Sequence, residues 1–242
     1  MNFQIAPHIV FTDPHLPWER PISENDSDVD NITPWLAVFP FDVNHPTNPE
    51  LRLTDPQLAD VKLALGLKDT DKPGPTFSIS TTVKDFLALP TQMKATAKNG
   101  TTVQIPGYSN DSQYANLQND TTPIEVIFMA PKLFQDLFCT NGAPNVDQFR
   151  FCAHIRNINT TGITNAGTSD TGLFSVVHSK RSGPYDVTPN TTPRSQAVHL
   201  LSLEFLNTLT QFESTDLVAL VSLYRWTYLC QPPLSVNFID GK

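Results

Sequence analysis

The sequence predicts a mainly β protein with two or three short helices, an α+β fold of about ten strands arranged as a β-sandwich or a barrel. Charged residues make up only 17% of the 242 residues and Gly is scarce, whereas Thr, Asn and Pro are abundant. This composition favours extended segments joined by ordered polar loops. Short apolar or alternating segments recur between prolines and glycines. The longest apolar run, residues 217–230, has the Val, Thr, Tyr and Trp content of a strand.

We expect residues 217–230 to form the strand around which the fold is organised. Read with a period of two, both faces of this run are apolar, which predicts a central strand buried on both sides. Val221 would then have no position facing solvent. Fourteen extended residues would span about 46 Å, longer than most single strands. The sequence therefore predicts a bend or bulge between Ser222 and Arg225.

The remaining elements are expected from turn residues and apolar periodicity. A helix over 55–65 is capped by Thr54 and ends at Gly66, a second begins at Pro131, and residues 81–89 form a short helix or strand that ends before Pro90. Asn99-Gly100 predicts a hairpin turn between strands 93–98 and 101–105. The other expected strands are 3–12, 35–41, 76–80, 124–130, 149–158, 173–181 and 197–205.

The segment 149–158 shows the clearest alternation in the chain. Phe149, Phe151 and Ile155 alternate with polar and basic residues, as in a strand with one buried and one solvated face. Residues 35–41 are apolar throughout, and Pro40 places that strand at the edge of a sheet or at a bulge.

Length and charge limit the classes of function. With 39% hydrophobic residues, the chain can bury the core of one β-rich domain spanning 1–242. The net charge of −8 argues against nucleic acid or anionic lipid as a partner, because both select clustered Lys and Arg. The sequence has neither a signal-peptide pattern nor a run of about eighteen apolar residues, so we expect a cytoplasmic protein without a membrane span. Three cysteines without a CxxC pair predict reduced core residues.

Several motifs together resemble a set of uncharacterised fungal and bacterial proteins. The motifs are LPWER (16–20), TPWLAVFPFD (33–42), PKLFQDLF (131–138), FCAHIRNI (151–158), SVVHSKRSG (175–183) and LVSLYRWTYLCQPP (220–233). The resemblance covers most of the chain. Because that set has no assigned activity, it implies a shared fold and no site residue. Its members are usually longer, which leaves open a natural short form or an N-terminal portion of a longer architecture.

Three histidines supply the sharpest hypothesis of enzymatic chemistry. His154, His178 and His199 each fall within an expected strand, and imidazoles from neighbouring strands could converge on a metal ion with an open position. Their neighbours on each strand differ, basic for His154 and apolar for the other two, so the sequence does not fix them to a common face. Hydrogen-bonded structural histidines are the alternative.

Aromatic residues in loops suggest a second kind of site. Trp18, Tyr108 and Tyr114 lie in expected loops, where they could form a platform that stacks on sugars or contacts a partner. Trp35 and Trp226 lie within apolar runs and are better explained by core packing.

The chain carries no GxSxG elbow, no glycine-rich phosphate loop, no GxGxxG and no HExxH. The sequence therefore favours a non-enzymatic structural, self-assembly or binding protein without a cofactor. A homo-oligomer or a protein partner is its expected form of association. Two alternatives stay open: a metal-dependent enzyme with the three-histidine site, and a carbohydrate-binding module that uses the loop aromatics.

Overall fold

The structure, a computed structural model, describes residues 7–20, 22, 33–68, 70–108, 117, 119–159, 161, 171–184, 192–209 and 216–230. Within these ranges lie three α-helices: α1 Asp55–Ala64, α2 Val83–Thr96 and α3 Pro131–Phe138. The eleven strands are β1 His8–Phe11, β2 Leu36–Phe41, β3 Ile79–Thr82, β4 Thr102–Gln104, β5 Pro123–Met129, β6 Cys139–Thr140, β7 Ala143–Pro144, β8 Ala153–Asn159, β9 Thr171–His178, β10 Arg194–Ser202 and β11 Asp216–Cys230. This content confirms the predicted class, mainly β with a few helices.

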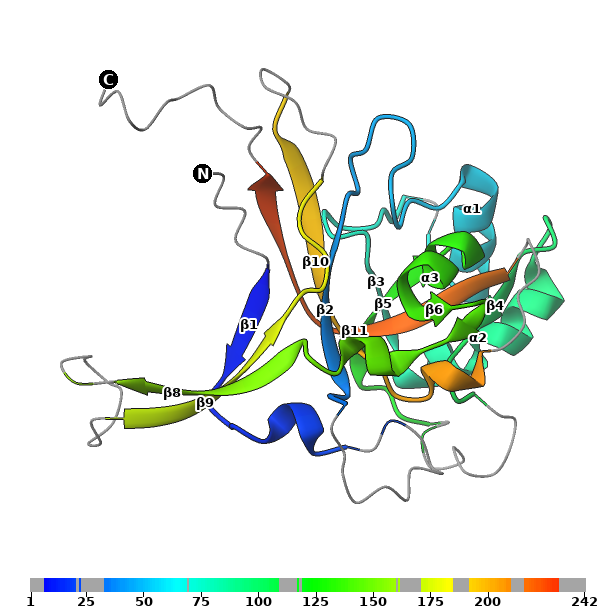
Figure 1. Ribbon diagram of the computed structural model, residues 1–242. Helices are drawn as coiled ribbons and strands as arrows, with labels where there is room; N and C mark the ends of the chain where they lie inside the picture. The colour runs from blue at the N-terminus through cyan, green and yellow to red at the C-terminus, as the bar shows by residue number, and fades with distance from the viewer. Residues whose placement is uncertain are drawn as a thin grey trace.

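Two sheets form the body of the protein (Figure 1). The main sheet has the order β2-β10-β11-β5-β3, with β4 paired in parallel to the first residues of β11. The second sheet has the order β1-β9-β8, and β6 and β7 form a small ladder of their own. Neither of the two larger sheets closes into a barrel in the described residues, so the sandwich-like alternative describes the fold.

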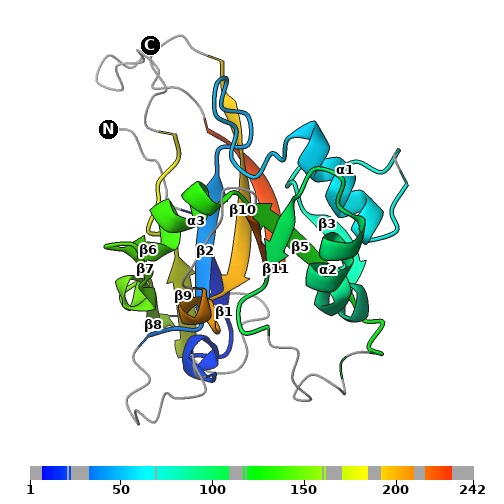
Figure 2. The ribbon, with the colours of Figure 1, turned by 90° about the vertical axis from the view of Figure 1, so that its right-hand side faces the viewer.

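Both faces of the main sheet are covered. On one face, α3 packs a phenylalanine cluster against β2, in which the ring of Phe39 lies 4.8 Å from that of Phe138 and 5.4 Å from that of Phe149. On the other face, α1 and α2 cover β5 and the start of β11, while the β1-β9-β8 sheet covers β2 and β10. Figure 2 shows α1 and α2 gathered beside β3 and β5, away from α3.

Strand β11 lies in the middle of this arrangement, as expected. The predicted irregularity is present, because the pairing with β10 shifts between Leu200 and Leu201 and leaves Leu223 as the extra residue of a bulge. The prediction of burial on both faces is wrong beyond Leu220. Val221 is half-buried and most of the residues from 223 to 229 are exposed, because β5 pairs with β11 only as far as Ser222.

The expected hairpin around Asn99-Gly100 is wrong. Helix α2 continues through Pro90 to Thr96, because Leu89 and Met93 are buried against the main sheet and this packing outweighs the missing N–H group of the proline. Residues 97–101 instead connect α2 to β4. The buried carboxylate of Asp60 in α1 fixes this connection by accepting from the N–H of Lys98 (2.9 Å) and the hydroxyl of Thr101 (2.9 Å).

The expected half-buried strand over 149–158 begins four residues later than predicted. A 3₁₀ turn spans Val146–Phe149, and the N–H of Cys152 donates to the carbonyl of Phe149 (2.8 Å). This turn inverts the expected pattern, so that Phe151 is 81% exposed while Cys152 is buried.

The α1 and α3 predictions are confirmed, including the Thr54–Gln57 capping box of α1. Strand β2, with Pro40, is an edge strand as predicted.

The difference in burial between the two halves of β11 can be tested by introducing Asp at one position in each half. Val218→Asp should lower the free energy of unfolding by several kcal/mol, because Val218 is fully buried and the carboxylate would be desolvated without a partner. Leu229→Asp, on the exposed half, should change it by about 0.5 kcal/mol or less. Urea unfolding midpoints measure both. Equal losses would mean that β11 is buried along its whole length.

Candidate functional site

The second half of β11 has a strand neighbour on one side only. From Ser222 to Cys230 it pairs with β10, whereas β5 on the opposite side pairs only as far as Ser222. From there β5 stays with β3 and separates from β11. The described residues therefore leave an open strand edge after the bulge at Leu223, and an open edge presents backbone groups that can pair with another chain.

Pro40 identifies which residues of β11 direct backbone groups at this edge. Pro40 is paired with Val198 but has no N–H, and its carbonyl accepts from Arg181 Nη1 (3.0 Å). This pair is therefore of the type without mutual hydrogen bonds, so the N–H and C=O of Val198 face β11, where Trp226 is the partner. Because the direction alternates along a strand, the residues on either side of Trp226 point the other way. The backbone groups at the open edge are those of Arg225, Thr227 and Leu229.

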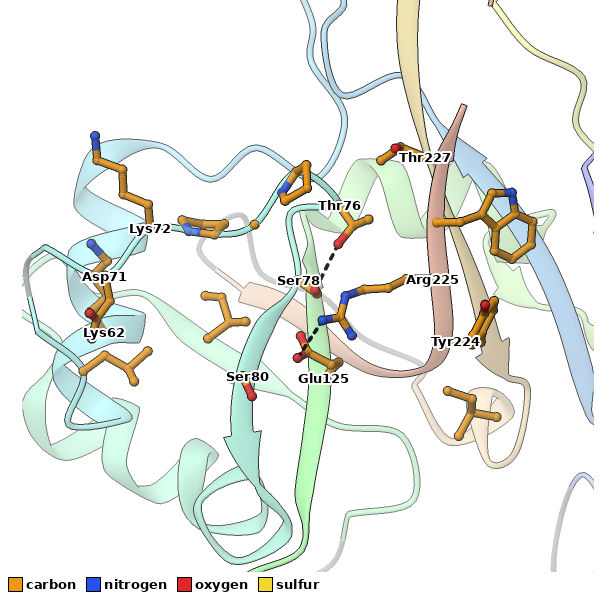
Figure 3. Close-up of a pocket in the computed structure, with 17 residues that line it drawn as sticks. Lys62, Asp71, Lys72, Thr76, Ser78, Ser80, Glu125, Tyr224, Arg225 and Thr227 are labelled. Carbon is orange, nitrogen blue, oxygen red and sulfur yellow. Dashed lines mark hydrogen bonds and ion pairs between the residues drawn. The ribbon is translucent and has the colours of Figure 1, made fainter. Parts of the chain in front are cut away.

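A groove with a volume of about 760 Å³ runs beside this edge (Figure 3). One wall is Leu223–Thr227 of β11. The opposite wall is the segment 71–80, in which Pro73 and Pro75 restrict the backbone, together with the end of α1. Figure 3 shows Thr76, Ser78 and Ser80 along this wall, facing β11. The volume lies within the range common for binding pockets, about 300–1,000 Å³.

The groove carries one ion pair at the point where β5 and β11 separate. Arg225 Nη2 lies 2.9 Å from Glu125 Oε1, with 39% and 21% of the two side chains exposed. Figure 3 shows the guanidinium reaching from β11 across to β5. Lys62, Lys72 and Asp71 line the far end. The charges of the lining side chains therefore nearly balance, leaving one more cation than anions.

His199 holds the far wall of the groove onto the sheet. Its side chain projects from β10 and is fully buried, and its two ring nitrogens lie 2.8 Å from Ser222 Oγ and 2.8 Å from the carbonyl of Thr76. A carbonyl only accepts, so Nε2 carries the proton and Nδ1 accepts from Ser222. Burial lowers the pKa of His199 to about 4, although the hydrogen bond to Thr76 opposes this and the positive charge of Arg225 adds to it. His199 is therefore neutral at pH 7.

The side chains lining the groove point to binding more than to covalent chemistry. They provide hydroxyls, aliphatic and aromatic surface, two lysines and the Arg225–Glu125 pair, with no histidine or cysteine among them. The Ser222–His199 pair has the contact of a nucleophile and its base, but both residues are buried beneath the wall and Ser222 does not line the groove.

The structure brings together two of the three histidines proposed as a metal site. The rings of His154 in β8 and His178 in β9 lie 5.7 Å apart, and His8 of β1 is the cross-strand partner of His178. His199 lies in the separate environment described above. His178 already contacts the carbonyl of Phe151 (3.0 Å), and His154 Nε2 accepts from Arg156 Nε (2.8 Å). Among the residues whose positions are described, no group of three or more His, Cys, Asp or Glu is arranged to hold a metal ion.

The two loop aromatics that the structure describes, Trp18 and Tyr108, lie in different parts of the fold. Trp18 packs against the cluster between the two sheets, and Tyr108 packs against the cluster beneath α1 and α2. Tyr114 lies outside the described residues. Trp226, which the sequence assigns to the core, packs against the cluster between the two sheets and also lines the groove together with Tyr224, their ring centres 5.9 Å apart.

Buried ion pairs lie at a second hollow, of about 490 Å³. Glu50 accepts two hydrogen bonds from Arg181 (2.7 and 3.1 Å) and one from the N–H of Asp42 (2.8 Å). Asp42 is also paired with Arg194 (3.1 Å). Burial raises the pKa of Asp42 despite this partner. The charges at this hollow are directed at one another, which indicates a structural role.

Sequence reasoning missed the groove, because its walls are distant in the chain. Residues 71–80 read as a connector and 223–227 as the middle of a buried strand. The available signal was Arg225, the one charge within the apolar run. A charge there is tolerated only where the strand leaves the core, and it marks the position of the open edge.

Comparison with known proteins identifies no relative: no family model, no curated protein and no solved structure matches the chain. The resemblance to uncharacterised fungal and bacterial proteins stays a prediction. In the part of the chain that the structure describes, no helix has the length and apolar character needed to cross a membrane. The three cysteines are free thiols; Cys152 and Cys230 are buried and Cys139 is partly buried.

Titration of His199 should make the fold sensitive to acid. The pKa of a histidine in an unfolded chain is about 6.5 and that of His199 in the fold is about 4, so the unfolded state takes up the proton first. The neutral ring makes its full contribution to the free energy of unfolding above pH 6.5. This contribution falls by about 3 kcal/mol in all as the pH is lowered toward 4. His199→Gln should remove this pH-dependent loss, measured as the free energy of unfolding between pH 4 and 7.

The matched control for this measurement is His15→Gln, at a site away from the core. It should keep the wild-type dependence on pH. The assignment fails if the stability of His199→Gln follows the same curve between pH 6.5 and 4 as the wild-type protein.

Proposed function

We propose that this protein binds an extended segment of a partner polypeptide, which adds as a strand to the open edge of β11. The observation that carries the proposal is the alignment of the backbone groups of Arg225, Thr227 and Leu229 along the open edge, where Arg225 and Thr227 also form one wall of the groove. Backbone hydrogen bonds to such an edge supply affinity, and pockets for alternate side chains supply specificity.

The side chains at this edge favour binding of a partner strand rather than blocking of the edge. Natural proteins usually blunt exposed edges with charges, prolines or bulges. Arg225 and the bulge at Leu223 do so in part. However, Leu223, Tyr224 and Leu229 are 46%, 57% and 54% exposed. Large apolar side chains held in solvent beside unpaired backbone groups are typical of a surface that a partner covers.

The two faces of the groove differ in chemistry, which gives the proposed ligand a pattern. Side chains of an added strand alternate between the two faces of the sheet. Those on one face would lie beside Tyr224 and Trp226, where aliphatic or aromatic groups pack well. Those on the other face would lie beside Arg225, Thr227 and the hydroxyls of the opposite wall, where polar or acidic groups can pair. The favoured segment therefore alternates apolar with polar or acidic residues.

Thr227→Pro tests this proposal. The variant loses the one N–H that Thr227 directs into the groove and places a ring at the edge, while the hydrogen bonds from β11 to β10 remain. Peptides selected from a displayed library of random sequences serve as the probe. Their affinity should fall at least tenfold, and the free energy of unfolding should fall by about 1 kcal/mol or less. Titration calorimetry and urea unfolding measure the two quantities.

Trp226→Pro is the control for the direction of the backbone groups, and it is compared on stability alone because the Trp226 ring itself lines the groove. The N–H of Trp226 in the wild-type protein faces Val198. Proline at this position should therefore lower the free energy of unfolding by about 1–3 kcal/mol, because the hydrogen bond to β10 is lost and the carbonyl of Val198 is left unpaired. A second readout is amide hydrogen exchange, in which bound peptide should slow exchange at Arg225, Thr227 and Leu229. Selected peptides that bind Thr227→Pro as tightly as the wild-type protein, or that protect amides elsewhere, would contradict the proposal.

A further inference from the structure

The groove at β11 favours an alternating sequence, and the chain carries such a sequence just after β11. The strand ends at Cys230, and the segment 234–239 reads Leu-Ser-Val-Asn-Phe-Ile. From Leu234 to Phe238, apolar residues alternate strictly with Ser and Asn. Residues 231–242 lie outside the described part of the chain. Their sequence has the pattern that suits a strand with one face toward aromatic rings and the other toward polar groups.

One antiparallel register matches the segment 234–239 to both faces of the open edge. Residues directly opposite each other in an antiparallel pair have their side chains on the same face. The register that brings apolar side chains to the aromatic rings and a hydroxyl to a hydroxyl has as opposed pairs Val236 with Trp226, Phe238 with Tyr224, and Ser235 with Thr227. Asn237 lies opposite Arg225 in the same register. Pro233 lies opposite Leu229 and has no N–H, so the ladder ends there.

The residues between β11 and this segment oppose a hairpin within one chain. In the register above, the loop of such a hairpin would be residues 230–232. The common three-residue loop has helical backbone angles at its first two residues and a positive φ at its third. Gln231 precedes a proline, which disfavours helical angles, and the ring of Pro232 excludes a positive φ. The sequence between the two strands therefore favours pairing with a second molecule.

We propose that the segment 234–239 of one copy of this chain adds as a strand to the open edge of β11 in a second copy. This inference rests on the strand-addition site proposed above and names the partner of that site. Because the segment and β11 belong to one continuous stretch of chain, a twofold axis at Gln231 forms both strand additions at once. Each copy donates its own segment and receives that of the other, so the assembly closes as a dimer. The added strand covers the exposed side chain of Tyr224.

Sedimentation equilibrium of the full chain tests this inference. The wild-type protein should show a reversible monomer–dimer equilibrium over concentrations from about 1 to 100 µM. The double variant Val236→Ser, Phe238→Ser removes the apolar side chains that face the aromatic rings and should weaken association at least tenfold.

The matched control is the double variant Phe3→Ser, Ile5→Ser. Residues 1–5, Met-Asn-Phe-Gln-Ile, also alternate apolar with polar side chains, but they precede β1 in the other sheet. This variant therefore removes a similar amount of apolar surface from an alternating segment and should leave the equilibrium unchanged.

Amide hydrogen exchange of the wild-type protein locates the contact without any substitution. Exchange at Arg225 and Thr227 should slow as the protein concentration rises through the same range, because the N–H groups of these residues bond to the segment of the second copy. Protection that does not change with concentration, yet is lost in Val236→Ser, Phe238→Ser, would mean that the segment pairs with its own β11. That result would overturn the inference.

A wild-type protein that stays monomeric across this range would also overturn the inference. So would a dimer that survives Val236→Ser, Phe238→Ser, or one that Phe3→Ser, Ile5→Ser weakens equally. The proposed function is judged separately by the peptides selected from the random library. If these peptides slow exchange at Arg225 and Thr227 in a chain that stays monomeric, the edge binds peptide and only the identity of its partner is wrong.

Discussion

The structure depends on how β11 is paired along its length. Its first residues have β4 or β5 beside them and carry apolar side chains on both faces, so they belong to the core. After the bulge at Leu223, β10 is the only strand beside it in the described residues. A bulge increases local twist and bends the strand that contains it. The bend turns β11 away from β5, and the space between them becomes the groove.

The groove is held open by interactions that lie beneath it. His199 reaches from β10 to the carbonyl of Thr76 and accepts from Ser222 next to the bulge, so one neutral ring joins β10, β11 and the far wall. Because all three are tied to a buried point, the width of the groove is set before any ligand arrives. Rigid walls reduce the loss of conformational entropy on binding. Arg225 and Glu125 bridge the end where β5 and β11 separate.

The β8–β9 pair and the groove both lie where a strand extends beyond the strand next to it. In both places a strand continues after its neighbour has ended, which exposes apolar side chains that the alternation of the sequence would bury. In the groove the exposed groups include backbone donors and acceptors, which suit an extended peptide. On the β8–β9 pair they are the side chains of Ile155 and Leu173.

Sequence by itself determined the elements whose signals are local. The capping box at Thr54, the proline that opens α3 and the apolar runs of β2, β5 and β10 place those elements, and the length of the 217–230 run predicts its bulge. Tertiary structure alone decided the course of α2 through Pro90, where packing of Leu89 and Met93 outweighs one missing hydrogen bond. It also decided which histidines meet, and it formed the groove from segments about 150 residues apart. The local sequence pattern indicates whether a side chain prefers burial. Whether a neighbouring strand is present to bury that side chain depends on where each strand ends, which is set by pairing between distant segments.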